Sequence, residues 1–176
     1  RRVSINRAYD SALIFLTEPV QLLGIKMSDL VLSLVQKYLE GKHGIRRYLM
    51  DSYWCANYRQ LVARGRLNGV DRNKFAKLGY EAQWCIFDPV ISTIYGKRFL
   101  KSGWKWDYER QVRYFRRAVS QITDNRFDQP YRCPEAWFYE KGKYVPNDQV
   151  PLAWTQANLL VAFKYMKLCL KAGAGG

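Results

Sequence analysis

Metal-binding residues are scarce in this sequence and badly spaced for a metal site. His43 is its one histidine, and the cysteines at positions 55, 85, 133 and 169 include no CxxC pair. A zinc site needs closely spaced Cys and His ligands, so we predict neither a metal centre nor another cofactor. Cys85 and Cys169 fall within apolar helical patterns, where a buried free thiol is the common role. We therefore expect a cytoplasmic or other reducing intracellular compartment.

Long hydrophobic runs are also missing. The sequence has no stretch of about eighteen uncharged apolar residues, so we expect no membrane-spanning helix. It has no initial methionine and no segment that resembles a secretory signal. The chain opens on RRVS and ends on KAGAGG, which suggests a piece of a longer protein or a chain whose ends are not fully determined.

Acidic residues are few. The 176 residues include 15 Asp and Glu against 29 Lys and Arg, which gives a net charge of +14. Such a balance favours an anionic partner, or a basic subunit whose assembly supplies the acid. No RNP sequence, GXXG clamp or zinc knuckle accompanies the charge, so nucleic acid is the weaker interpretation. The length and the 48% of apolar residues predict one domain with a sizeable core.

Strand patterns are the last absence. No convincing strand pair or βαβ succession occurs, whereas helical patterns dominate, so we predict an all-α fold. The connecting loops are rich in Gly, Asn, Asp, Arg and aromatic residues, and such loops often carry function. The expected helices occupy residues 9–19, 27–44, 81–96, 107–123 and 152–173.

Capping and proline residues refine these helices. Ser28 is expected to be the N-cap of the second helix, and Gly41 its C-terminal cap. Pro89 predicts that the third helix kinks or restarts there. Pro151 suits the first turn of the last helix, which Gly173 should end.

The helix expected at 107–123 separates apolar from basic residues. Its predicted apolar face consists of Tyr108, Val112, Phe115, Val119 and Ile122. The roughly opposite face carries Arg110, Arg113, Arg116 and Arg117. We interpret these arginines as a solvated helix face, with contact to phosphate or to an acidic subunit as the alternative.

Glu135 stands between Pro134 and the aromatic run 137–139. Glycosidases use two carboxyl groups, one that gives a proton and one that activates water or attacks. Nearby rings can stack on sugar faces, and desolvation can raise the pKa of a carboxyl group. Glu135 with these rings and Trp154 fits that chemistry. An ordinary loop acid beside an aromatic core is the competing interpretation.

A second polar and aromatic cluster lies in the stretch GIRRYLMDSYW. Arginine and aspartate can hydrogen-bond sugar hydroxyls while tryptophan supplies a stacking face; the alternative is a salt-bridged loop that plugs a helix junction. The cluster consists of Arg46, Arg47, Asp51, Tyr53 and Trp54.

Three polar residues interrupt the hydrophobic segment EAQWCIFDPV. Buried acids need partners, so these residues either line a polar cavity or pair with the arginines of GIRRYLMDSYW. They are Glu81, Gln83 and Asp88.

Four segments in succession resemble the glucoamylase-like domain of glycoside hydrolase family fifteen. They are YDSALIFLTEP, LEGKHGIRRYLMDSYW, YEAQWCIFDPVISTIYG, and CPEAWF followed by VPNDQVPLAWTQANLLVA, which together cover most of residues 9–170. The likeness is greatest to the version in the regulatory alpha and beta subunits of phosphorylase kinase. It implies an (α/α)6 toroid with its site in a loop-lined funnel. The implied activity is inverting cleavage of α-glucans, or a regulatory role where that activity is lost.

The resemblance also implies roles for particular residues. Glu135 takes the place of the general base, which activates the water. The predicted substrate-binding residues around the funnel are Arg47, Asp51, Tyr53, Trp54, Glu81, Trp84, Trp137 and Trp154.

Two departures from the family pattern matter. The family's general acid lies in a Trp-Glu motif upstream of YDSALIFL, which this chain does not contain; such catalysis is worth roughly 10²- to 10⁴-fold. Six or seven helices also cannot close a twelve-helix toroid. We therefore expect residues 1–172 to be the C-terminal part of the toroid domain, residues 173–176 to be a tail, and the isolated chain to be inactive.

The resemblance leaves three functional hypotheses. The first is a site for α-glucan or another oligosaccharide, completed by the missing half of the toroid or by other protein subunits. The second is a catalytically silent structural or regulatory subunit of a large assembly. The third, with less support, is a basic component that contacts nucleic acid.

Overall fold

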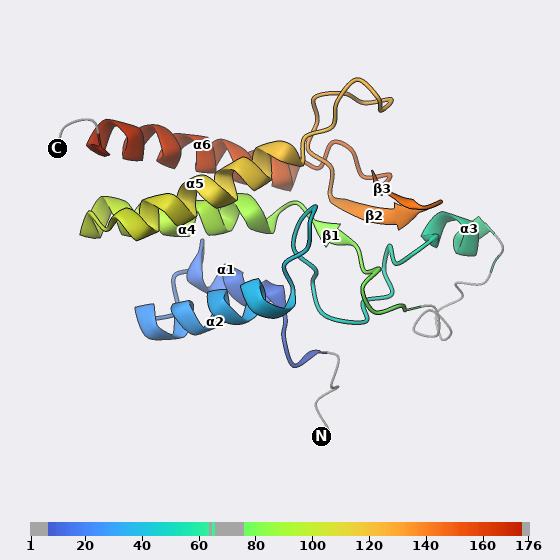
Figure 1. The fold of residues 1–176 in the computed structure, drawn as a ribbon, viewed down its shortest axis with the longest axis horizontal. Helices are drawn as coiled ribbons and strands as arrows, with labels where there is room; N and C mark the ends of the chain where they lie inside the picture. Colours follow the sequence, from blue (N-terminus) through green and yellow to red (C-terminus); the bar gives the residue numbers. More distant parts are fainter. Residues whose placement is uncertain (1–6, 64, 66–75, 174–176) are drawn as a thin grey trace.

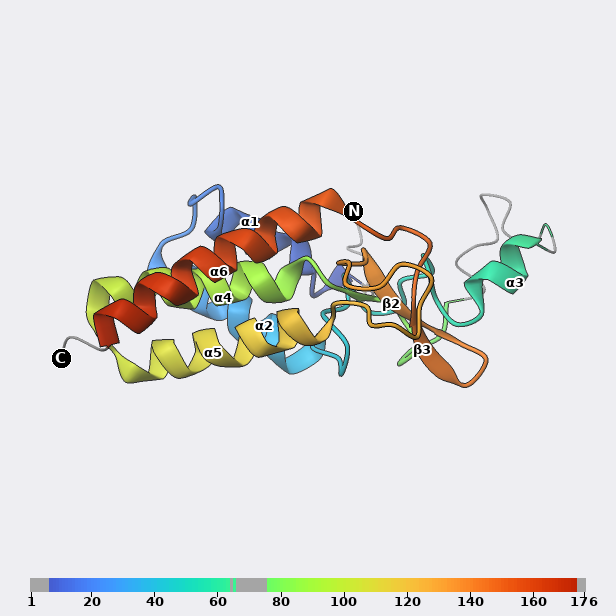
Figure 2. The ribbon, with the colours of Figure 1, turned by 90° about the horizontal axis from the view of Figure 1, so that it is seen from above.

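The computed structural model describes residues 7–63, 65 and 76–173. Over these residues the chain is mostly helical and also contains a small three-stranded sheet (Figure 1). The long helices form one part of the molecule, and the sheet lies at one end of them beside the short helix α3 (Tyr58–Ala63) (Figures 1 and 2). The predicted helical character is confirmed, and the absence of strands is not.

Helix α4 (Phe87–Ser102) lies at the centre of the helical part. Every residue from Phe87 to Gly96 is buried, as its nearly uniform apolar sequence predicts. Pro89 does not kink this helix but stands in its first turn, where the missing N–H has no intrahelical partner to lose. The predicted start at residue 81 was therefore wrong. At the other end, Gly103 takes a left-handed conformation (φ 72°), and its N–H donates to the carbonyl of Phe99.

Helix α5 (Lys105–Ser120) packs against α4 through a stripe one position away from the predicted apolar face. Its buried residues are Asp107, Gln111, Tyr114 and Ala118. Val119, expected inside, is 37% exposed. The hydroxyl of Tyr114 donates to Glu40 and the carboxylate of Asp107 accepts from the hydroxyl of Ser102, so hydrogen bonding overrides the apolar pattern at these two positions.

Helix α6 (Ala153–Gly173) follows Pro151 and packs on α4 and α5 (Figure 2). Its buried stripe is Thr155, Leu159, Ala162, Met166 and Cys169, which recurs every three or four residues as one helix face requires. Of the predicted tail, Gly173 is the last residue of α6. Residues 174–176 lie outside the described part of the chain.

On the other side of α4 lie the 3-10 helix η2 (Ser11–Leu13), α1 (Ile14–Thr17) and α2 (Ile25–Tyr38) (Figure 1). The predicted caps of α2 were both wrong. Ser28 is a buried residue inside the helix, where its hydroxyl accepts a hydrogen bond from Arg98. The helix ends before Gly41.

The sheet was not predicted. Strands β1 (Gln83–Trp84), β2 (Ala136–Glu140) and β3 (Lys143–Pro146) pair antiparallel in that order. Lys141 (φ 48°) and Gly142 (φ 87°) form a two-residue turn between β2 and β3, with the left-handed conformations that tight hairpins require. Gln83 and Trp84 are thus extended because β1 pairs with β2, whereas Ile86 already has the helical backbone angles that lead into α4.

Candidate functional site

The backbone of Glu135 is fixed on both sides. Glu135 directly precedes β2, and its N–H donates to the carbonyl of Gln149 (2.9 Å) while its own carbonyl accepts from the N–H of Cys85 (3.0 Å). These bonds join the end of β1 to the segment that leads into α6. The Glu135 side chain is half-buried, so its position is set by the sheet and not by a free loop.

The carboxyl group of Glu135 has one protein donor in the described part of the chain. Asn147 Nδ2 donates to Glu135 Oε2 over 2.6 Å. Two hydrogen bonds to the backbone of Ala136 hold Asn147 in place. The N–H of Asn147 donates to the Ala136 carbonyl (2.9 Å), and its side-chain Oδ1 accepts from the Ala136 N–H (3.3 Å). Burial raises the pKa of Glu135, while the Asn147 hydrogen bond and the charge of Arg47 offset part of the rise.

Arg47 is the cation whose charge lowers the pKa of Glu135. Its Nε and Nη2 atoms form two hydrogen bonds with Asp51, at 2.6 and 2.9 Å, so the guanidinium is oriented by a buried carboxylate. The guanidinium carbon lies 4.5 Å from the centroid of the Trp84 ring and 5.1 Å from that of Tyr53. These two rings stack with centroids 6.0 Å apart. Arg47, Asp51, Tyr53 and Trp84 therefore form one cluster; the first three belong to the group predicted in GIRRYLMDSYW, whereas Trp84 comes from β1.

Glu81 is buried and fully engaged by its neighbours. Its two oxygens accept hydrogen bonds from the N–H groups of Met50 (2.9 Å) and Gly79 (2.8 Å), and Arg46 Nε lies 3.3 Å away. The carboxylate thus ties the loop at residues 46–50 to the segment before β1. This arrangement supports a role in positioning the Arg47 loop.

The remaining tryptophans of the predicted set lie apart from one another. Trp54 is in the core, edge-on to Phe138. Trp137 is also buried, and its indole N–H donates to the carbonyl of Gln121. Trp154 is 56% exposed and stacks on Phe15 with centroids 5.1 Å apart. Of these three rings, only that of Trp154 presents a large open surface.

A hollow on the surface is lined in part by Asn147. It has a volume of about 450 Å³ and is bordered by Arg59, Lys143, Asn147 and Asp148 among others, but not by Glu135. Arg59 pairs there with both Glu140 and Asp148 at 2.6 Å. This hollow therefore reaches Asn147, the hydrogen-bond partner of Glu135, but not Glu135 itself.

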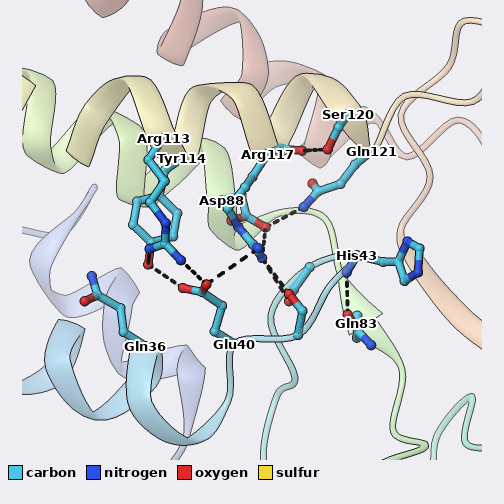
Figure 3. Close-up of polar contacts among 12 residues, drawn as sticks. Gln36, Glu40, His43, Gln83, Asp88, Arg113, Tyr114, Arg117, Ser120 and Gln121 are labelled. Carbon is cyan, nitrogen blue, oxygen red and sulfur yellow. Dashed lines mark hydrogen bonds and ion pairs between the residues drawn. The ribbon is translucent and has the colours of Figure 1, made fainter. Parts of the chain in front are cut away.

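Two acids, Asp88 and Glu40, meet arginines of α5 in a second cluster (Figure 3). The sequence analysis did not predict that these residues come together. Asp88, buried in α4, accepts from Arg117 Nε (2.6 Å) and contacts the side-chain amide of Gln121. Glu40 accepts from the hydroxyl of Tyr114 (2.6 Å) and pairs with Arg113. Burial raises the pKa of Asp88, and Arg117 offsets part of that rise.

The same cluster corrects the interpretation of the α5 arginines. Arg117 also donates to the carbonyls of Gly41 (3.0 Å) and Gly44 (3.3 Å), and Arg110 donates to Gln36. Three of the four arginines expected on a solvated face thus bind other parts of this chain, while Arg116 is exposed. These hydrogen bonds hold residues 41–44, which follow α2 and lead directly into the loop at residues 46–50 that contains Arg47.

Three further findings concern the cysteines, metal binding and membrane spans. All four cysteines are buried and unpaired, as predicted for Cys85 and Cys169. No three His, Cys, Asp or Glu side chains come together as metal ligands among the described residues. In the same part of the chain, no helix combines the length and hydropathy of a membrane span.

Comparison with known proteins does not extend this picture. No protein-family model matches the chain, and no curated protein matches it either. The glucoamylase-like resemblance therefore depends on the four sequence segments alone.

Proposed function

We propose that this chain forms one wall of an α-glucan-handling site of the glucoamylase type, with Glu135 as the general base. In this proposal α4, α5, α6 and the helices before them belong to an (α/α)6 toroid. The general acid and the opposite wall come from other parts of the assembled protein.

The observation that carries the proposal is the state of the Glu135 carboxyl group. One oxygen, Oε2, is held by Asn147, and no described residue donates to Oε1. A carboxylate with one anchored and one free oxygen can orient a water molecule and accept its proton. Burial raises the pKa of Glu135, and a base is most effective when its pKa approaches the working pH.

Arg47, with its two neighbouring rings, and the exposed ring of Trp154 support the sugar-binding part of the proposal. The Nε and Nη2 atoms of Arg47 donate to Asp51, whereas its Nη1 donates to no described residue. In this proposal Nη1 donates to a sugar hydroxyl. The stacked rings of Tyr53 and Trp84 fix the guanidinium from the other side. The exposed ring of Trp154 offers an apolar surface for a sugar face.

Hydrolysis needs a second carboxyl group. Asp51 binds Arg47, and Glu81 binds two backbone N–H groups, so neither is free to protonate a leaving oxygen. We therefore expect this chain by itself to bind glucan weakly and to hydrolyse none.

The test is maltoheptaose hydrolysis by the intact natural protein and its Glu135→Gln variant. Loss of the base should lower kcat by at least about 10²-fold, with a small change in KM. Glu109→Gln is the matched control, because it makes the same change on the exposed face of α5. Equal rates for Glu135→Gln and the unaltered protein would refute the assignment of Glu135.

A second candidate, a silent structural or regulatory subunit, is favoured by the surface of α6. Apolar side chains that are exposed on this helix, beyond Trp154, are Leu160, Val161, Phe163, Leu168 and Leu170. Apolar residues gathered on one helix are typical of a surface that another protein covers. An intact protein that binds maltoheptaose without hydrolysing it would support this candidate over the enzyme.

A further inference from the structure

A second groove lies at the opposite end of the helices from Glu135. It has a volume of about 740 Å³ and opens where the start of α2 meets the turn between α4 and α5. Figures 1 and 2 place this turn at the end of the helical part that is remote from the sheet. The 16 residues of α4, about 24 Å of helix, separate the groove from the region of Glu135.

Two tryptophans dominate the groove. Trp104 is 70% exposed and Trp106 is 48% exposed. The guanidinium of Arg110 covers one face of Trp106 at 4.7 Å, and Tyr95 packs edge-on to the same ring. Trp106 is therefore a fixed wall, whereas no ring or cation of the described residues covers Trp104.

The backbone holds Trp104 in this exposed position. Gly103 adopts the left-handed conformation that ends α4, and the N–H of Trp104 donates to the hydroxyl of Ser102 (3.1 Å). Leaving a large indole in water forfeits the free energy of burying it. A fixed turn that exposes this ring is a feature of binding surfaces, where tryptophan is enriched.

The charges of the groove compensate one another. Asp29 pairs with Arg98 at 2.5 Å. Asp107 lies near the same arginine, and the hydroxyl of Ser102 is 3.4 Å from its carboxylate. Of the four charged residues lining the groove, only Asp29 and Arg98 form an ion pair in the described chain, which leaves Lys101 and Asp107 as one unpaired charge of each sign. A groove with two rings and nearly balanced charges fits an uncharged ligand that has both apolar faces and hydroxyl groups.

We propose that this groove binds an uncharged oligosaccharide. One sugar ring stacks on the open face of Trp104, and the next contacts the edge of Trp106. Hydroxyl groups donate to the exposed carboxylate of Asp29 and accept from Lys101. The groove is independent of the Glu135 chemistry, so this proposal stands or fails separately from the proposed function.

The experiment is a ¹⁹F NMR titration of the intact protein labelled with 5-fluorotryptophan. The signals of Trp104 and Trp106 are assigned from the Trp104→Phe and Trp106→Phe variants. The probes are maltoheptaose, cellohexaose and xylohexaose, which differ in linkage and shape but carry no charge. At least one of them should shift both signals, and Trp104→Ala should weaken its binding by about tenfold.

Two controls make the result specific. Tyr131→Ala removes another exposed ring, far along the chain from the groove, and should leave the Kd unchanged. Glu135→Gln should also leave it unchanged, even if it abolishes hydrolysis. Near-UV circular dichroism checks that each variant is folded. The proposal is overturned if none of the three sugars shifts the Trp104 signal, or if Trp104→Ala binds as tightly as the unaltered protein.

Discussion

Two carboxyl groups in this molecule, those of Asp88 and Glu135, differ in how many hydrogen bonds their oxygens accept. Asp88 is fully buried, and its two oxygens receive Arg117 and the amide of Gln121. Glu135 is half-buried; Asn147 donates to one oxygen, and Arg47 acts on it through charge without a hydrogen bond. Asp88 and Arg117 join α4 to α5, whereas Glu135 directly precedes β2.

The difference separates a structural carboxylate from a candidate reactive one. A buried acid is tolerated when donors and a counter-charge satisfy it, and then it has no capacity left for a ligand. Glu135 keeps an oxygen without a donor in the described chain, although burial raises its pKa. The comparison thus predicts that changes around Asp88 act on stability, and that changes around Glu135 act on proton affinity.

The largest effect is expected from Arg117→Met. This change leaves the buried Asp88 carboxylate without its counter-charge and frees the carbonyls of Gly41 and Gly44. We expect the free energy of unfolding to fall by about 3–5 kcal/mol, measured by urea denaturation. Arg116→Met is the matched control on the exposed side of the same helix and should change stability by less than about 0.5 kcal/mol. Similar values for the two variants would remove the structural role assigned to this network.

Such a network shows why sequence reasoning reached only part of the fold. The apolar pattern of α4 and the position of Pro151 before α6 are local signals, and both helices exist, although α4 begins at Phe87 instead of residue 81 and α6 begins two residues after Pro151. Arg117 and Glu40, in contrast, are 77 positions apart, and no local pattern indicates that they meet. The helix at 107–123 was placed correctly, but its buried face follows partners such as Tyr114 and not the apolar stripe.

The sheet and the surroundings of Glu135 also depend on contacts between residues that are far apart in the sequence. The turn at Lys141–Gly142 between two aromatic-rich segments is a hairpin signal that was present in the sequence. β1 has only two residues and exists because β2 lies beside it. Asn147 was not singled out, because its importance comes from the strand pairing that brings it to Glu135.

An intermediate effect is expected from Asn147→Ala. The variant loses the hydrogen bond to Glu135 and leaves the N–H of Ala136 without its side-chain acceptor. We expect a loss of about 1–2 kcal/mol in unfolding free energy. Because this hydrogen bond lowers the pKa of Glu135, its removal should raise that pKa further, as measured by ¹³C NMR titration of the carboxyl carbon.

The control for that variant is Asn125→Ala, in an exposed loop. It should alter stability by less than about 0.5 kcal/mol and should not move the Glu135 titration. A Glu135 pKa that stays the same in Asn147→Ala would show that the hydrogen bond does not hold the carboxylate. The contrast between the carboxyl groups of Asp88 and Glu135 would then lose its basis.

The smallest effect is a change in the pH dependence of stability in Glu135→Gln. Folding raises the pKa of Glu135 above its ordinary value of 4.5, so between these two values the folded chain keeps a proton that the unfolded chain has lost. Stability contributed by this group therefore falls as the pH rises through that window. Asp88 shifts in the same direction, so only the difference between the unaltered protein and Glu135→Gln isolates Glu135. That difference, measured by urea denaturation from pH 4 to 7, should move in favour of the variant as the pH rises; movement in the opposite direction would mean that the folded environment favours the charged carboxylate.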